Sequence, residues 1–331
     1  IAKIVTSDTG SPRMLWEWRP PYFQDRKVGS GVRFDRRAYN TIASIPPAFK
    51  DKISKTLNLS GEKVDAVLKN LGKNGVGLAS LLAIGGNHAT GALGFHFSYK
   101  VLELHDELIA GNRCQVIIPL DAADSFLRVL AKSGKYEIQK RADLLLIDIL
   151  LNETGCLINM APIEITHRNL GKCENYPPLK SPIINEKIEQ LDYSFRVINK
   201  LIQNLSYESS LHLSAMASLV EAAFYLSGQG IKKELKGKIL NNIVSGAMEL
   251  KSNRGVMLYF QDQPNREGLS KFKWEPGSYN SKLLDNFNEC FGVFFIDPNR
   301  NEKELWEGST NGDLKQEINK LFRWLFTPIK Q

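Results

Sequence analysis

Two apolar runs in the middle of the chain predict neighbouring buried strands. Residues 142–151 (ADLLLIDILL) and 156–168 (CLINMAPIEITHR) are apolar almost throughout, a pattern typical of strands that are covered on both faces. The intervening residues 152–155 (NETG) form a turn signal, so the two strands are expected to form a hairpin. Residues 114–121 (CQVIIPLD) predict a further strand before the hairpin.

Helical periodicity predicts that helices surround these strands. In residues 185–202 the apolar side chains Ile188, Leu191 and Phe195 recur every three or four positions, as on one face of an amphipathic helix. Other helices are expected at 62–71 behind Ser60 as N-cap, and at 89–103, 211–226, 235–250 and 314–325, with apolar strands at 255–260 and 292–297. We therefore expect an α/β protein with a mixed sheet flanked by helices.

Changes in composition and periodicity along the sequence divide the chain into three parts. Residues 1–50 contain Pro-rich breaks and are expected to be irregular, so residues 1–75 are interpreted as an irregular N-terminal arm followed by a helix. Residues 76–205 hold the predicted hairpin and its helix and form the core. Residues 206–331 are expected to be a helical and β extension that packs on this core.

The positive charge is concentrated in the N-terminal arm. The chain has 43 Lys and Arg against 36 Asp and Glu, a net charge of +7. Residues 1–60 alone hold eleven basic and five acidic residues. Such a distribution permits an anionic partner, with nucleic acid as the first candidate and Arg33, Arg36 and Arg37 as contacts. A solvated surface with scattered ion pairs is the alternative interpretation.

Cysteine usage and hydropathy bear on the compartment. The four cysteines have no metal-ligand spacing, so free thiols in a reducing cytoplasm are expected. The most apolar run, residues 211–226, is shorter than the ~20 residues that a bilayer-spanning helix needs, and no membrane partner is expected. Because the first residue is Ile1 rather than Met, we interpret the sequence as part of a longer protein.

The predicted hairpin brings two acids together. If its centre lies between residues 153 and 154, Asp143 faces Glu164, with Cβ atoms ~5 Å apart. Two carboxylates this close repel each other, and a cation bound between them removes that cost. Thr166 points to the same face as Glu164. The helix predicted at 185–202 has a polar face that carries Lys187 and Gln190. This face either packs beside the two acids or is exposed to solvent.

These residues resemble the motif of the PD-(D/E)XK nuclease superfamily over about residues 80–205. The resemblance rests on Asp143 at the head of a buried strand, on residues 162–166 (PIEIT), and on residues 189–191 (EQL) in the next helix. It implies a restriction-endonuclease-like core in which Asp143 and Glu164 bind Mg²⁺ or Mn²⁺ and Gln190 assists. The chain is also similar to the nuclease-like region of large anti-phage DNA-translocating ATPases, including those of phosphorothioation-dependent restriction, at 16–23, 75–95, 141–149 and 161–168.

One departure from this motif leaves two functions open. Thr166 stands where the superfamily has its catalytic lysine, so Lys187 or Arg168 would have to supply the charge, and Arg does not readily act as a base. The first function is metal-dependent hydrolysis of double-stranded DNA by a nuclease domain of a larger anti-phage restriction protein. The alternative is a catalytically inactive DNA-binding or subunit-docking module of a DNA-translocating defence complex.

Overall fold

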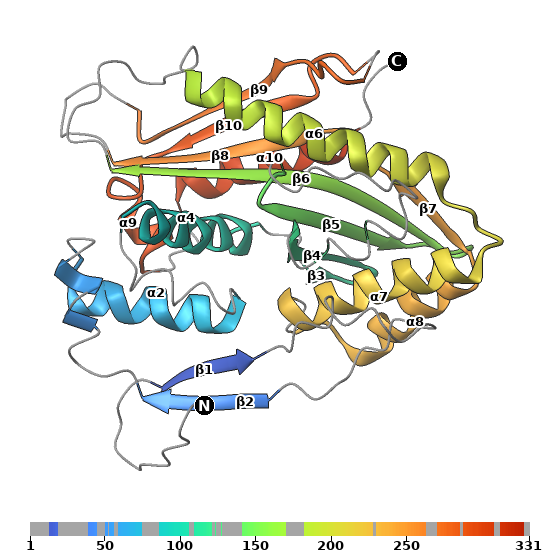
Figure 1. Ribbon diagram of the computed structural model, residues 1–331, viewed down its shortest axis with the longest axis horizontal. Coiled ribbons are helices and arrows are strands. Elements are labelled where there is room, and N and C mark those ends of the chain that lie inside the picture. Colours follow the sequence, from blue (N-terminus) through green and yellow to red (C-terminus); the bar gives the residue numbers. More distant parts are fainter. Residues whose placement is uncertain are drawn as a thin grey trace, which may run out of the picture.

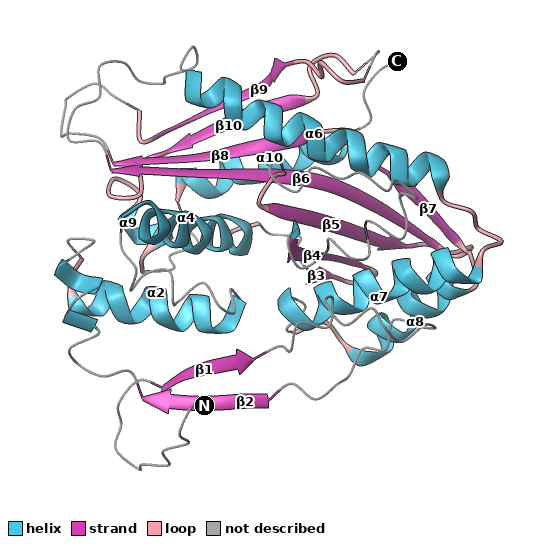
Figure 2. Ribbon diagram, viewed as in Figure 1, coloured by secondary structure: helices cyan, strands magenta, loops and turns pink. Residues whose placement is uncertain are grey.

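The fold is built around one mixed sheet of eight strands (Figures 1 and 2). The computed structural model describes residues 13–18, 39–44, 50–51, 53–55, 59–74, 86–105, 109–120, 123, 127, 141–169, 182–227, 230–262, 270–284, 287–307 and 312–327. The strands of the sheet are β3 (Ile109–Ala110), β4 (Arg113–Pro119), β5 (Leu144–Leu151), β6 (Cys156–Asn169), β7 (Met248–Lys251), β8 (Gly255–Asp262), β9 (Phe272–Tyr279) and β10 (Phe291–Ile296). The expectation of an α/β protein with a mixed sheet is confirmed.

The centre of the sheet changes from antiparallel to parallel at β6. The spatial order is β3-β4-β5-β6-β8-β10-β9, in which β4, β5 and β6 form an antiparallel meander. Strands β7 and β8 both run parallel to β6, β7 along its first half and β8 along its second, and β10 runs parallel to β8. Leu144 pairs with Ile163, which confirms the hairpin register predicted from the turn signal.

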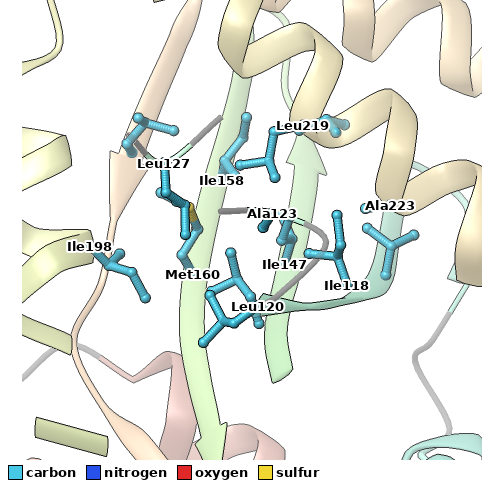
Figure 3. Packing of buried hydrophobic residues seen from close by; sticks show 14 of the residues in the cluster. Ile118, Leu120, Ala123, Leu127, Ile147, Ile158, Met160, Ile198, Leu219 and Ala223 are labelled. Atoms are coloured by element: carbon cyan, nitrogen blue, oxygen red, sulfur yellow. The ribbon is translucent and has the colours of Figure 1, made fainter. Parts of the chain in front are cut away.

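Helices cover both faces of this sheet. One face packs against α6 (Pro182–Asn204), α7 (Ser210–Ser227) and α8 (Lys233–Val244). In Figure 3, side chains of the sheet such as Ile147, Ile158 and Met160 meet Ile198 of α6 and Leu219 of α7. The other face packs against α2 (Gly61–Asn74), α4 (Gly86–Glu103), α9 (Glu302–Leu305) and α10 (Asp313–Phe326). Successive residues of a strand therefore enter different cores.

Helix α6 crosses β6 and β8 directly (Figure 1). It begins at Pro182, whose fixed φ suits the first turn of a helix, and it buries the predicted apolar stripe. A Cβ atom on Gly255 would lie 3.1 Å from Leu191 Cδ1 and 3.2 Å from Pro162 Cγ, so the helix approaches the sheet closely at this point. Because α6 is pressed against the sheet, its polar residues can reach side chains of β6.

Several local predictions need correction. Residues 1–50 were expected to be irregular, but β1 (Arg13–Trp18) and β2 (Tyr39–Ser44) form an antiparallel pair, so the Pro-rich breaks separate strands rather than prevent them. The helix predicted at 235–250 ends at Val244, because Gly246 adopts a φ of 77° that favours glycine and terminates helices. Strands β3, β7 and β9 were missed.

The remaining predicted elements agree with the structure within a few residues. Ser60 precedes α2, and the Lys63 amide lies 3.4 Å from its Oγ. The predicted boundary near residue 205 falls between α6 and α7, and β8 and β10, which follow it, are hydrogen-bonded into the same sheet as β6. Among the described helices, none combines the length and apolarity needed to span a bilayer.

Candidate functional site

Asp143 is placed beside β6 by backbone and side-chain hydrogen bonds. Its amide donates to the Ile163 carbonyl at 3.1 Å, which extends the β5–β6 ladder by one residue. Its Oδ2 accepts the Ile165 amide at 2.8 Å. In this register Asp143 lies opposite Glu164, as the hairpin signal predicted. One Asp143 oxygen therefore has a structural hydrogen bond, and this bond also fixes the carboxylate next to Glu164.

Glu164 is a completely buried carboxylate, with 0% of its surface exposed. It alternates with Ile163 and Ile165, which belong to the opposite core, so it faces α6. Lys187 Nζ of α6 lies 2.6 Å from Glu164 Oε1, but neither Glu164 oxygen accepts a hydrogen bond of normal geometry from a described residue. Burial, followed by the charge of Asp143, raises the pKa of Glu164 well above its ordinary value, and Lys187 opposes this shift.

Lys187 and Gln190 bring charge and a hydrogen-bonding group from α6 to this pair of acids. Burial is the largest single influence and lowers the pKa of Lys187, but the charge and hydrogen bond of Glu164, together with the charges of Asp143 and Glu186, raise this pKa above its ordinary value. Lys187 Nζ also donates to Gln190 Oε1 at 3.0 Å, so one ammonium links Gln190 to Glu164. Of the two alternatives for the polar face of this helix, the structure therefore shows Lys187 beside Glu164 and Gln190 beside Lys187.

Further contacts hold α6 in this position. Ser194 Oγ accepts the amide of Ala142, the residue before Asp143, at 2.8 Å. Asp192 is 3% exposed and accepts the Ser281 hydroxyl at 2.5 Å and the Lys282 amide at 2.7 Å. The helix that carries Lys187 is therefore attached to the start of β5 and to the segment after β9.

The other predicted site residues differ in their placement. Thr166 lies on the Glu164 side of β6, is 8% exposed, and its hydroxyl has no hydrogen-bond partner among the described residues. Arg168 pairs in register with Gln261 of β8, and among the described residues no ion pair joins it to either acid. Of the two proposed substitutes for the missing lysine, Lys187 is the one that reaches Glu164. Arg33, Arg36 and Arg37 lie outside the described residues.

The two acids are a small but suitable donor set for a divalent cation. Within the part of the chain that the structure describes, no three His, Cys, Asp or Glu side chains gather as a metal-binding group. Mg²⁺ needs fewer, because it is commonly held by one or two carboxylates and completes its shell with water and substrate phosphate. Both Glu164 oxygens lack a hydrogen bond of normal geometry among the described residues, and Oε2, which is not the oxygen paired with Lys187, could serve as such a donor beside the charge of Asp143. The residues present therefore fit Mg²⁺ or Mn²⁺.

A second buried carboxylate, Asp148, was not singled out from the sequence. It is 1% exposed and accepts hydrogen bonds from Arg113, Gln115 and Asn159 on the neighbouring strands. The signal was available, because each of these strands carries a polar residue within an apolar run. With the predicted hairpin register, Asp148 also pairs with Asn159.

An open pocket of about 600 Å³ lies away from the two acids of the candidate site. It is lined by the β5–β6 turn and α8, with Asn152, Glu153 and Lys238 among its residues. The described residues that line it include no buried unpartnered polar group, so we do not assign chemistry to it.

No protein-family model, no curated protein and no solved structure matches this chain.

Proposed function

We propose that this protein is a nuclease or nuclease-derived domain of a larger anti-phage restriction protein and hydrolyses phosphodiesters of double-stranded DNA with Mg²⁺ or Mn²⁺. The observation that carries the proposal is the convergence of Asp143, Glu164 and Lys187 from β5, β6 and α6. The order of elements, with α4 before the β4–β5–β6 meander and α6 before the parallel strand β8, is consistent with a restriction-endonuclease-like core.

Each residue has a distinct role in this proposal. Asp143 and Glu164 would hold the cation, which supplies activation of water and neutralises the charge of the phosphate. Lys187 adds a fixed positive charge beside the acids, where it stabilises the negative charge that develops on the phosphate. Gln190 accepts a hydrogen bond from Lys187 and so orients the ammonium. Arg168 has no assigned role in this scheme.

A second function is favoured by the same site. Glu164 is completely buried and already paired with Lys187, and Thr166 has no charge where the superfamily has lysine. A DNA-binding or subunit-docking module without catalysis would retain this ion pair as a structural contact. The two functions differ in one measurable respect, metal-dependent cleavage.

The decisive experiment is cleavage of plasmid DNA in the presence of Mn²⁺ by the wild type and by Asp143→Asn. An asparagine keeps a side-chain oxygen that can accept the Ile165 amide, so this variant removes charge with little change in structure. We expect cleavage to fall by about 10²–10³-fold, the usual loss when one electrostatic contributor is removed.

The matched control for this experiment is Asp148→Asn, which alters a buried carboxylate of β5, the strand that directly follows Asp143, but on the opposite face of the sheet. This variant should cleave DNA at the wild-type rate once the rate is divided by the folded fraction. Circular dichroism on the same samples measures that folded fraction. Equal cleavage by the wild type and Asp143→Asn contradicts the nuclease proposal. Metal-independent binding of DNA without cleavage supports the second function.

The proposed DNA contact of the basic arm has its own test. Replacement of Arg33, Arg36 and Arg37 by Glu should weaken binding to a duplex and reduce the steep dependence of affinity on salt, because fewer counterions are released. A binding isotherm at several salt concentrations measures both effects. Salt-insensitive binding by the wild type would contradict this role.

A further inference from the structure

Strand β7 leaves one backbone edge of the sheet open. It pairs with the first half of β6, and β8 takes over that side of β6 from Ile163 onward (Figure 1). Strand β10 extends the sheet beyond β8, but among the described strands none pairs with the outer side of β7. The backbone groups on that side are therefore available to another strand.

The other two edge strands have features that prevent such pairing. Strand β3 has only two residues. Strand β9 contains Pro276, which has no N–H to donate, and Gly277 with a φ of 62°, and its register with β10 shifts at a bulge. Prolines, bulges and very short strands protect sheet edges from association. Strand β7 has four residues without proline or glycine, so it is the better template for a further strand.

The direction of the backbone groups of β7 determines which residue faces outward. The Ala247 carbonyl accepts the Cys156 amide of β6 at 3.0 Å, so residue 247 turns toward β6. Because this direction alternates along a strand, Glu249 and Lys251 also turn toward β6, and Leu250 turns away. The N–H and C=O of Leu250 are thus the central open pair on the outer edge.

A second copy of β7 fits this edge in one register. If two copies pair antiparallel about a two-fold axis, the Leu250 amide of each donates to the Leu250 carbonyl of the other. Glu249 of each copy then lies opposite Lys251 of the other. These are the non-hydrogen-bonded positions of the pair, where facing side chains lie closest. In the register that Leu250 imposes, the strand is therefore complementary in charge to itself.

Both charged side chains are accessible at this edge. The Glu249 side chain is 63% exposed and that of Lys251 is 40% exposed. Within one chain, Lys251 Nζ lies 2.9 Å from Glu249 Oε1, and an exposed pair of this kind contributes little to stability. Opposite charges directly across an antiparallel pair stabilise that pair. Pairing between copies therefore gains two such contacts at little cost to the single chain.

Exposed apolar side chains lie beside the residues that lead into β7. A Cβ atom added to Gly246 would lie 3.3 Å from the Tyr207 carbonyl oxygen, so Tyr207 adjoins this segment. Val244 ends α8 two residues before this glycine, and Leu211 lies in the first turn of α7. Tyr207, Val244 and Leu211 are all exposed. The open edge is thus flanked by apolar surface, which is common in contacts between proteins.

We propose that the outer edge of β7 is a homodimer interface, in which two copies pair antiparallel through Leu250 and form Glu249–Lys251 ion pairs across the two-fold axis. The occupant is a second copy because the charges of β7 complement their own sequence in this register. The inference does not depend on the proposed function, since Asp143, Glu164 and Lys187 lie outside the interface.

Sedimentation velocity of the protein at about 1–100 µM tests this proposal, because small interfaces commonly have micromolar affinities. We expect the wild type to shift from monomer to dimer over this range. Glu249→Lys should weaken dimerisation at least about tenfold, because like charges then face each other in both pairs. Combining Glu249→Lys with Lys251→Glu restores opposite charges and should bring the dissociation constant back to within about threefold of the wild type.

Lys320→Glu is the matched control. It reverses one partner of another surface ion pair, Lys320 with Glu317 on α10, which lies outside β7. This variant should dimerise like the wild type. All the substituted side chains are at the surface, so every variant should melt within about 2 °C of the wild type. Equal dissociation constants for Glu249→Lys and the wild type, or no recovery in the double variant, would overturn the proposal.

Amide hydrogen exchange, resolved to single residues by mass spectrometry, tests the register. The Leu250 amide should exchange more slowly at about 100 µM than at about 1 µM, because dimerisation gives it an acceptor. The Glu249 amide already faces β6 and should exchange at the same rate at both concentrations. Unchanged exchange at Leu250 contradicts the proposed pairing. A wild type that stays monomeric overturns the proposal, even if a strand of another protein binds to β7.

Discussion

Glu164 and Asp148 are both buried carboxylates of the same sheet, but they lie on opposite faces and have different surroundings. Asp148 receives four hydrogen bonds of 2.7–3.3 Å from Arg113, Gln115 and Asn159, so both of its oxygens are satisfied. Glu164 is paired with Lys187 through Oε1 and leaves Oε2 without a partner among the described residues.

This difference separates a structural acid from a candidate functional one. The Asp148 cluster joins β4, β5 and β6 and is complete without any ligand, because every accepting oxygen is used. The surroundings of Glu164 are less complete: burial and the charge of Asp143 raise the pKa of its carboxylate, and the Lys187 ammonium and a backbone hydrogen bond from Asp143 only partly oppose this rise. Burial alone is therefore a poor guide to function; the state of the hydrogen-bonding groups distinguishes the two acids.

The largest expected effect is on stability. Asp148→Ala should lower the free energy of unfolding by about 3 kcal/mol, because it leaves the Arg113 charge and two amides without their common partner. Glu164→Gln should lower it by less, about 1 kcal/mol, because it removes a carboxylate whose pKa burial already raises, and because the Lys187 ammonium that loses its partner is 28% exposed and can still reach water. Urea denaturation at pH 7 measures both. A larger loss for Glu164→Gln than for Asp148→Ala would reverse the comparison.

An acid-dependent loss of stability is expected from the face opposite the candidate site. His96 is 0% exposed in α4, and burial, with a smaller effect of Lys100, lowers its pKa from 6.5 to about 3. The unfolded chain takes up a proton near pH 6.5 and the folded chain does not. Stability is therefore fully present above pH 6.5 and is lost progressively as the pH falls toward 3, with about 2 kcal/mol lost at pH 5.

His96→Phe removes the titrating ring from the aromatic contacts with Phe97 and Trp306. Between pH 6.5 and pH 4, the unfolding free energy of the His96→Phe variant should fall less steeply than that of the wild type. The difference between the two slopes should be about 1.4 kcal/mol per pH unit. Urea denaturation at four pH values measures the slope. An unchanged slope would mean that another group is responsible for the acid sensitivity.

The smallest expected effect concerns the strength of the ion pair in the site. A double-mutant cycle with Lys187→Met and Glu164→Gln should give a coupling of about 1–2 kcal/mol, because the carboxylate is shielded from water. The same cycle for Lys282 and Glu189, an exposed pair at 3.3 Å that also involves α6, should give less than about 0.5 kcal/mol. Equal couplings would show that burial does not strengthen the Glu164 pair.

Much of the fold was predictable because the relevant signals are local. The apolar runs and the turn at residues 152–155 predicted β5, β6 and their register. The apolar stripe of α6 was predicted from its spacing. Strand β9 was missed because its mixed, half-exposed residues give no clear alternation. Strand β7 was missed because the helical pattern before it was extended through Gly246.

The candidate site was predictable only in part. The two-residue period of a strand determined that Asp143, Glu164 and Thr166 share a face once the register was known. The choice between Lys187 and Arg168 could not be made, because it depends on how closely α6 approaches β6. The contacts at Gly255 and Ser194 that set this approach join residues distant in the chain.

The sequence by itself determined the strands β4, β5, β6, β8 and β10, the hairpin register and the common face of the two acids, because backbone geometry repeats along a strand and a short turn sets the pairing. Only the tertiary structure decided which acid has a full set of partners. Asp148 is satisfied by three neighbouring side chains, whereas Glu164 receives one ammonium from a helix. Such differences arise from packing between elements, and a sequence pattern describes each element separately.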